Sequence, residues 1–328
     1  MRLVFRWLLP IILLLFVFWG SLFLFYPLKV APLDALGVIL FRSDNSIADI
    51  TVTNLRLPRS LGAMLIGSAL AVAGTLLQAM TRNPLASPTL LGINSGASLA
   101  MVIASAISPS ILSSLSISFI AALGGGLSWA LVMLISQGWA QHIERTRIVL
   151  AGIAVSMLCA ALTKMTLILS EDNAYGIMSW LAGNISHIRW SAVQTLALFS
   201  LPAIIISLLL ANKLNIMNLS DDNAKSLGIE LKKLRLILNI AALVLVGVSV
   251  SVAGPFAFIG LLIPHLARYW IGYDLRKSLP IAIIFGASLM LLADNLARAV
   301  VFPNELPAGA ILALIGAPFF VWIARGKR

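Results

Sequence analysis

Charged residues are scarce in this chain, and their scarcity excludes most soluble folds. Asp, Glu, Lys and Arg make up 11% of the 328 residues, whereas hydrophobic residues make up 60% and the mean hydropathy is +1.01. Soluble domains carry roughly a quarter charged residues and at most about half apolar ones. A soluble fold of this length would have to hide more apolar surface than its core can hold, so the composition predicts a membrane protein.

Acidic residues are scarcer than basic ones, which gives a formal charge of +11. The basic residues do not form a stripe with interleaved aromatic residues, so a nucleic-acid-binding face is excluded. They lie in short clusters between long apolar runs, which is the pattern that orients membrane proteins. The bias of Lys and Arg toward alternate connections predicts that both termini are cytoplasmic.

Residues that commonly carry chemistry are few. The single cysteine, Cys159, excludes an internal disulfide, and His142, His187 and His265 are scattered without the spacing of metal ligands. The only Gly-Lys pair lies in the C-terminal tail, so the chain has no nucleotide-binding loop. We therefore expect no catalytic residue, no metal and no cofactor bound by this chain. If ATP drives the protein, another chain hydrolyses it.

Apolar runs of about 20 residues predict ten membrane-spanning helices and an all-α membrane protein. The first run is too long for a signal peptide and no clear cleavage site follows it, so it is predicted as a span. The predicted spans are Trp7–Leu28, Ser60–Met80, Leu90–Ile107, Ser113–Ser136, Ile148–Leu169, Ser191–Leu210, Leu236–Ala253, Pro255–Trp270, Leu279–Val300 and Ala308–Ala324. We expect one transmembrane domain over residues 1–328, with a first half of about 1–190 and a second half of about 191–328.

A faint internal repeat links the second and seventh predicted spans. The pattern Gly-x-x-x-x-Val-Ala-Gly occurs at Gly67–Gly74 and again at Gly247–Gly254, each time before a stretch broken by proline. These two spans would cross the membrane in opposite directions, which is the arrangement of an inverted repeat in transporters. Chance similarity between apolar segments explains four matched letters equally well.

Ionisable residues inside membrane spans are costly and are therefore candidates for function. Lys164 lies toward the end of the fifth span, where it either reaches the interface or lines a path for an anionic substrate. Asp294 and Arg298 are four residues apart on the ninth span, and this spacing predicts an ion pair on one helix face. No chain of buried acids and histidines supports an ion-coupled secondary transporter. No catalytic constellation supports a membrane-embedded enzyme.

The cytoplasmic segment Met217–Leu236 contains the pattern of a short helix. Ser220 is a candidate N-cap followed by two aspartates, and Gly228 is a candidate C-terminal stop. Ala224 and Leu227 would give this helix a small apolar face. The pattern favours a docking helix for a soluble partner, and a solvated turn is the alternative.

Two arginines stand on the opposite side of the membrane, against the positive-inside trend. Arg56 and Arg59 lie three residues apart where the second span begins, and Pro58 suits the first turn of a helix there. They would bind either lipid phosphates or an acidic partner.

At this point the sequence resembles the permeases of the iron–siderophore and vitamin B12 ABC importers. The matching stretches, in the order of that family and spread over nearly the whole chain from Leu55 onward, are LRLPRSLGAMLIGSALAVAGTLLQAMTRNPLASPTLLGINSGA, AKSLGI, GPFAFIGLLIPHLAR, LLADNLAR and ELPAGAILALIGAPFFVW. One small departure is Phe256-Ala257, where such permeases usually have Ile-Gly.

The resemblance implies an inner-membrane permease with ten helices, paired with a second permease subunit, identical or related. It further implies two cytoplasmic ATPase subunits, a two-lobed extracytoplasmic binding protein and alternating access. Three groups of residues carry the implied roles: Arg56, Arg59 and Arg298 receive acidic residues of the binding protein; Ala224, Lys225, Ser226, Leu227, Gly228 and Ile229 seat in the ATPase; Asn83 and Leu85 belong to the inner constriction. The expected cargo is a ferric siderophore, with heme and vitamin B12 as alternatives.

Overall fold

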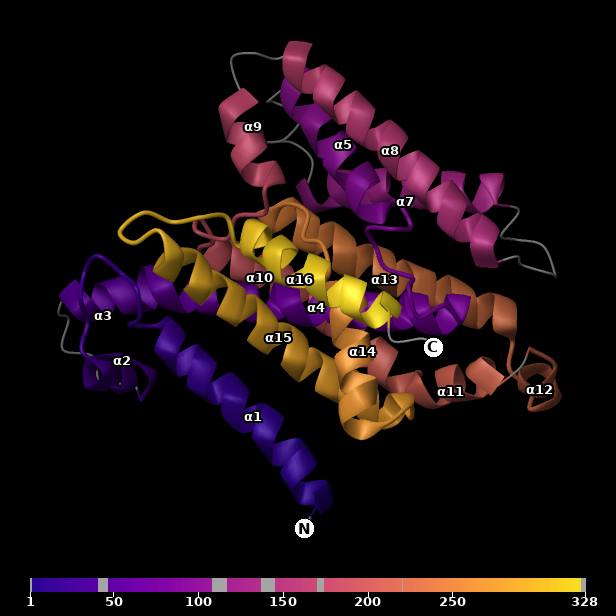
Figure 1. Cartoon of the computed structure of the whole chain (residues 1–328), viewed down its shortest axis with the longest axis horizontal. Helices are drawn as coiled ribbons and strands as arrows, with labels where there is room; N and C mark the ends of the chain where they lie inside the picture. The colour runs from indigo at the N-terminus through magenta and orange to yellow at the C-terminus, as the bar shows by residue number, and fades with distance from the viewer. Residues whose placement is uncertain are drawn as a thin grey trace.

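The computed structural model describes residues 2–40, 47–107, 117–136, 145–169, 174–219 and 221–325, and within these ranges every regular element is a helix (Figure 1). In chain order the elements are α1 Arg2–Ser21, α2 Pro32–Ile39, α3 Ile47–Thr51, the π-helical turn η1 Val52–Arg56, α4 Leu57–Thr81, α5 Ile93–Ile107, α7 Ile117–Ile135, α8 Arg145–Leu169, α9 Ala174–Leu181, α10 Trp190–Leu209, α11 Ala211–Leu219, α12 Asp221–Ser226, α13 Leu231–Ala253, α14 Ile259–Ile271, α15 Leu275–Val300 and α16 Ala308–Arg325.

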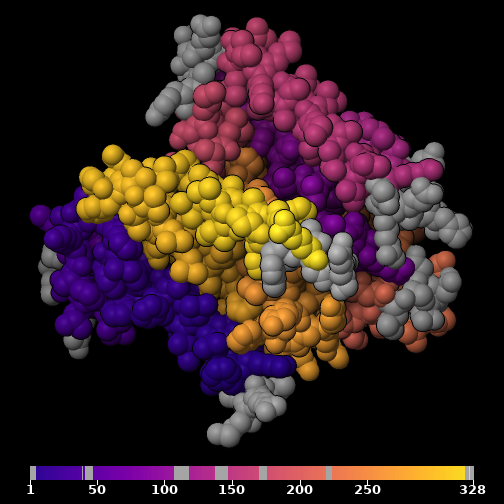
Figure 2. All heavy atoms as spheres, viewed as in Figure 1, coloured from indigo at the N-terminus to yellow at the C-terminus, as the bar shows by residue number. Residues whose placement is uncertain are grey.

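The helices form two groups that meet along α13. Helices α5, α7 and α8 pack on one another in the first group, and α9 contacts α8. In the second group α4 is surrounded by α10, α14 and α15, while α1 and α16 pack on α15. Helix α13 contacts α7 on one side and α4 on the other, so the two groups form one bundle. Figure 2 shows the first group as the pink and violet upper part of the molecule, with α16 at the surface below it.

Helix α4 is the most buried of the long apolar helices, because glycines let its neighbours approach closely. A Cβ added at Gly67 would lie 2.1 Å from the carbonyl oxygen of Gly286 on α15. A Cβ added at Gly74 would lie 1.9 Å from the carbonyl oxygen of Gly260 on α14. In lipid, helices gain little from burying apolar surface against each other, so close backbone contact through small residues holds them together.

The helices that follow α4 and those that follow α13 pack in a similar order. Helices α5, α7 and α8 pack in succession, as do α14, α15 and α16. Helix α4 packs on α14 and α15, and α13 packs on α5 and α7. The two repeated helices also run in opposite directions (Figure 1). The end of α4 lies near the start of α13, because Arg82 reaches α11, which precedes α13. The start of α4 and the end of α13 both contact the segment 187–188, through Gly62 and Val252 respectively.

Each of the ten predicted spans overlaps one helix, but several boundaries differ. Among the described residues, six helices are long and apolar enough to cross a membrane: Ile47–Thr81, Ser118–Ile135, Arg147–Leu169, Trp190–Leu209, Leu231–Ala253 and Leu275–Val300. In the same ranges α1, α5 and α16 contain shorter apolar stretches, Phe5–Ser21, Ile93–Ala106 and Ala308–Val321. The count of ten spans therefore stays a prediction. Helix α14, with 13 residues, is only ~20 Å long, less than the ~30 Å of a bilayer core.

The first predicted span was wrong at its C-terminal end. Helix α1 ends at Ser21, and the chain then turns instead of continuing to Leu28. Leu22 and Val30 pack with Ala35 and Val52 in a small apolar cluster of their own. The turn itself stays apolar, with Leu24, Phe25 and Leu28 exposed, so hydropathy did not mark the end of the helix. Helices α2, α3, α9 and α11 were not predicted, since they are short.

Replacing Gly67 by Ala should destabilise the bundle, because the added methyl group meets backbone atoms of α15 that cannot rotate away. We expect a loss of about 1–3 kcal/mol, measured as a lower unfolding temperature of the purified protein in detergent. The matched control is Gly176→Ala on α9, where an added Cβ meets nothing within 4 Å and alanine favours the helix. Equal unfolding temperatures for the two variants would contradict the packing argument.

Candidate functional site

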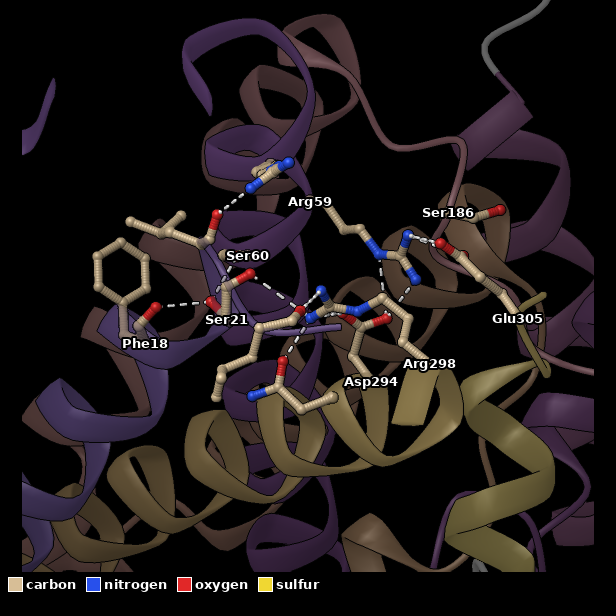
Figure 3. A network of polar contacts seen from close by, with 12 residues as sticks. Phe18, Ser21, Arg59, Ser60, Ser186, Asp294, Arg298 and Glu305 are labelled. Carbon is tan, nitrogen blue, oxygen red and sulfur yellow. Dashed lines mark hydrogen bonds and ion pairs between the residues drawn. The ribbon is translucent and has the colours of Figure 1, made fainter. Parts of the chain in front are cut away.

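A cluster of charged side chains joins three helix ends at one end of the bundle (Figure 3). The start of α4 supplies Arg59, the last turns of α15 supply Asp294 and Arg298, and η1 supplies Arg56. The turn that follows α1 lies against them, and a hydrogen bond of 2.7 Å joins the hydroxyl groups of Ser21 and Ser60. We term these four charged residues, with Glu305 and Tyr26, the arginine cluster.

Arg59 is held by two carboxylates. Its Nε and Nη2 donate to Oδ1 of Asp294 at 3.1 and 2.8 Å, and its Nη1 lies 2.8 Å from Oε2 of Glu305. Asp294 is buried, while the side chain of Glu305 is 32% exposed on the connection between α15 and α16. The fork of the guanidinium matches both carboxylates, which a lysine ammonium could not reproduce.

Arg298 lies on the other side of the same aspartate. Its Nη2 is 3.2 Å from Oδ2 of Asp294, so the ion pair predicted from the spacing of these two residues is confirmed. Its Nη1 also donates to the carbonyl oxygen of Leu24 at 2.8 Å, which ties the end of α15 to the turn after α1. Asp294 therefore bridges two arginines, one from α4 and one from its own helix.

Tyr26 separates the remaining two arginines. Its ring lies between the guanidinium groups of Arg56 and Arg298, with distances of 4.1 and 4.0 Å from the Cζ atoms to the ring centroid. Arg56 also donates to the carbonyl oxygens of Leu22, at 2.8 Å, and of Leu28. Cation–π contact and hydrogen bonds to the turn offset the cost of removing Arg56 from water.

The predicted docking arginines are thus brought together, but in this conformation they are buried. Arg56 is 2% exposed and Arg298 is 0% exposed. The cluster holds three cations and two carboxylates, Asp294 and Glu305, which leaves a net charge of +1. Its exposed carboxylate faces Arg59, so Arg59 is the arginine with a partner that an external acid could replace. Their role in docking stays a prediction.

The predicted coupling segment lies at the opposite end, and its helix ends as predicted. Helix α12 stops at Ser226, and Gly228 follows with a φ of +76°. The amide of Ile229 donates to the carbonyl of Ala224 at 3.0 Å, and that of Gly228 to Lys225 at 2.9 Å. These two bonds form a Schellman motif, in which glycine adopts the left-handed conformation at no steric cost. The predicted N-cap, Ser220, lies outside the described residues.

The predicted apolar face of α12 was wrong. Ala224 is fully buried against the bundle, whereas Leu227 is 65% exposed. Leu227 lies beyond the last helical residue, in the Schellman turn, so its side chain leaves the face on which Ala224 sits. Leu227 is therefore an exposed leucine on a turn whose shape is held by backbone hydrogen bonds.

Helix α11, which precedes α12, is tied to two long helices. The Nε of Arg82 at the end of α4 donates to the carbonyl oxygen of Met217 at 3.2 Å. Asn215 donates to Oδ1 of Asp274 at 2.7 Å and accepts from the backbone amide of Leu275 at 2.8 Å, at the start of α15. Hydrogen bonds from the Arg276 side chain, and then from Asn215, lower the pKa of Asp274 from 3.8 to about 2, so this carboxylate is ionised at neutral pH.

The three predicted pathway residues are not brought together. Asn83 and Leu85 form the turn after α4, where the Asn83 side chain accepts from the amide of Leu85 at 3.0 Å. Lys164 is exposed near the C-terminal end of α8, which packs mainly on α5 and α7. Their positions therefore do not support a common role for these residues within one chain.

Several residues in these contacts could not be predicted from the sequence. Glu305 and Tyr26 lie in connections whose position follows from packing, and Asn215 and Asp274 are separated by 59 residues. Asp274 carried one usable signal, since an aspartate directly before a helix is a typical N-cap, and its side chain does accept from the amide of Arg276.

Comparisons with known proteins identify the family of the chain. The sequence pattern of the FecCD transport family matches residues 12–326. The chain belongs to the FecCD transport family. It is 55% identical to the Fe(3+) dicitrate transport system permease protein FecC of Escherichia coli K12, over 98% of this chain and 97% of that protein. It is 40% identical to the Fe(3+)-citrate import system permease protein YfmD of Bacillus subtilis, over 88% and 85% of the two chains.

The fold matches as well. A solved ABC transporter assigned to the metal-chelate type, in an inward-facing conformation, aligns with a TM-score of 0.80 and 28% identity over 99% of this chain and all of that one. This member of the FecCD transport family is a multi-pass inner-membrane permease of the ABC-importer class.

Replacing Asp294 by Asn should destabilise the permease strongly, because two buried arginines lose the carboxylate between them. We expect a loss of about 3–5 kcal/mol, as for removal of one member of a buried ion pair. Glu305→Gln is the matched control, since it removes the partly exposed carboxylate of the same arginine and should cost about 0–1 kcal/mol. Unfolding in detergent measures both variants, and a Glu305 variant as unstable as the Asp294 variant would contradict the assignment.

Proposed function

We propose that this chain is the permease through which an ABC importer carries ferric citrate, a small iron chelate of the siderophore class, across the inner membrane. The observation that carries the proposal is the 55% identity over almost the whole length of both chains to a permease of Fe(3+) dicitrate transport. The small share of charged residues and the helical bundle fit a protein that conducts its cargo without reacting with it. The chain has no catalytic role in this proposal, and it binds no cofactor of its own.

The proposed complex contains two permease subunits, identical or related, two cytoplasmic ATPase subunits that hydrolyse ATP, and one extracytoplasmic binding protein. Both termini of this chain are cytoplasmic, so the arginine cluster faces outward and α12 faces the ATPase. Transport proceeds by alternating access. The loaded binding protein docks outside, ATP binding closes the ATPase subunits, and the coupling segment passes that motion to the helices. Such coupling requires contacts that differ between two states at both ends.

The binding protein docks, in this proposal, over the arginine cluster. Charge complementarity at such a surface sets orientation and speeds encounter. Arg59 makes the first contact, because an acidic group of the partner can replace the exposed carboxylate of Glu305 beside it. Arg56 and Arg298 hold the turn after α1 in place, and they reach the partner only when that turn moves away.

The ATPase contact is the segment Ala224–Ile229. Its support is the exposed side chain of Leu227, which sits on a turn whose shape is fixed by two backbone hydrogen bonds. An exposed apolar side chain on a rigid turn is suited to a pocket in a partner protein. Asn83 and Leu85 lie at the same end of the bundle and are proposed to border the inner constriction. Lys164, on the exposed face of α8, is proposed to face the pathway only across the interface with the second permease subunit.

Uptake of labelled iron should identify the cargo. Cells that lack this gene should lose most uptake of iron supplied as ferric citrate, and a plasmid copy should restore it. Heme, vitamin B12 and other ferric siderophores are supplied separately to the same cells as controls. Loss of uptake for heme or vitamin B12 instead would reassign the cargo within the family. Uptake that persists after ATP depletion and depends on the membrane potential would support a secondary transporter and overturn the proposal.

Replacing Leu227 by Asp should weaken the permease–ATPase association by about tenfold or more, because the exposed leucine is the proposed anchor. The change lies on the surface, so the permease should fold and reach the membrane at normal levels. Leu33→Asp, an equally exposed leucine on α2 at the other end, is the matched control. Co-purification of the ATPase with each variant measures the effect, and equal recovery from both would remove Leu227 from the contact.

A further inference from the structure

Helices α4 and α15 form one antiparallel pair held at several levels. At the arginine cluster, Asp294 of α15 binds Arg59 of α4 with two hydrogen bonds. Near the middle, Gly67 and Gly286 bring the two backbones into direct contact. One residue further along, the hydroxyl group of Ser68 donates to the carbonyl oxygen of Ile283 at 3.1 Å. A pair fixed by charge at one end and by backbone contact in its centre is suited to moving as a single body.

The opposite end of this pair is fastened to α11. Arg82, which follows α4, binds the carbonyl of Met217 on α11. Asn215, also on α11, binds the start of α15 with both halves of its amide group: the nitrogen donates to Asp274 and the oxygen accepts from the Leu275 amide. Helix α11 packs on α12, which belongs to the proposed coupling segment.

We propose that Asn215 is the positioning residue that transmits movement of the coupling segment to the α4–α15 pair, and through that pair to the arginine cluster. The proposal rests on the proposed function, because it takes α12 as the part that the ATPase moves. Arg82 holds α11 to α4 through a backbone carbonyl. Asn215 adds a side-chain bridge to the start of α15, and it uses a donor and an acceptor at once, which fixes both distance and orientation. Energetic coupling through proteins follows such contiguous packed and hydrogen-bonded elements.

The test exchanges the two side chains of the bridge. Asn215→Asp places two carboxylates against each other and breaks the bridge. The double variant Asn215→Asp with Asp274→Asn restores a donor opposite an acceptor, and asparagine remains a good N-cap for α15. Asn212→Asp is the matched control, because Asn212 is an exposed residue one turn earlier on α11 and gains the same charge.

The readout is the amount of ferric citrate transported per ATP hydrolysed, measured in proteoliposomes that contain the permease, its ATPase and the binding protein. Asn215→Asp should lower this ratio by at least about fivefold, the range of a typical coupling energy, while ATP hydrolysis without the binding protein stays unchanged. The double variant should restore the ratio, and Asn212→Asp should keep it. Unfolding temperatures in detergent accompany each variant.

Three outcomes would overturn the proposal. An unchanged ratio in Asn215→Asp, or a lowered ratio in Asn212→Asp as well, would remove Asn215 from transmission. If Asn215→Asp folds poorly, Asn215→Ala replaces it, and a proportional loss of transport and ATP hydrolysis there would mean that the bridge is structural only. Failure of the wild-type complex to import ferric citrate would instead contradict the proposed function, so the two failures are distinguishable.

Discussion

The buried carboxylate of Asp294 is the interaction on which the rest of the bundle depends. It is 1% exposed and lies between Arg59 of α4 and Arg298 of its own helix. Without it, Arg298 would be left as a buried cation, and Arg59 would keep only the partly exposed carboxylate of Glu305. The elements α3, η1 and α4 follow one another without a break, which places Arg56 and Arg59 opposite the end of α15.

Between the charged cluster and α11, the same helix pair is held by much weaker individual forces. Lipid is as apolar as leucine, so burying leucine between two spans gains little. The helices are therefore held mainly by close contact between their backbones, which the glycines of α4 permit against α14 and α15. The consequence is that stability depends on few positions. A surface leucine facing lipid can change with little effect, whereas one methyl group at a glycine or one lost carboxylate cannot be accommodated.

Sequence reasoning predicted what depends on local pattern. Hydropathy located a helix at each of the ten predicted spans, the spacing of Asp294 and Arg298 predicted their ion pair, and Gly228 marked the end of α12. What it missed depends on packing between distant segments. Arg59 and Asp294 are 235 residues apart, and no periodicity connects them. The end of α1 was misplaced because the apolar run continues into the turn that follows it, so hydropathy did not mark where the helix stops. The burial of the arginines was missed because their charge indicated exposure.

The two ends of the α4–α15 pair use different chemistry, and this difference suits the function proposed for each. At the arginine cluster the contacts are between charges in a dry environment, which are strong and respond sharply to another carboxylate brought nearby. At α11 the link is a neutral amide between a helix and the N-terminus of another, which is directional but modest in strength. The Asn215 amide does not titrate, and Asp274 stays ionised near neutral pH because its pKa is about 2, so the bridge keeps the same charge over that range. A permease that must respond to an acidic partner on one side and to a mechanical input on the other would gain from that division. In the proposed mechanism the arginine cluster responds to the docked partner, and the amide bridge keeps the helices aligned while they move.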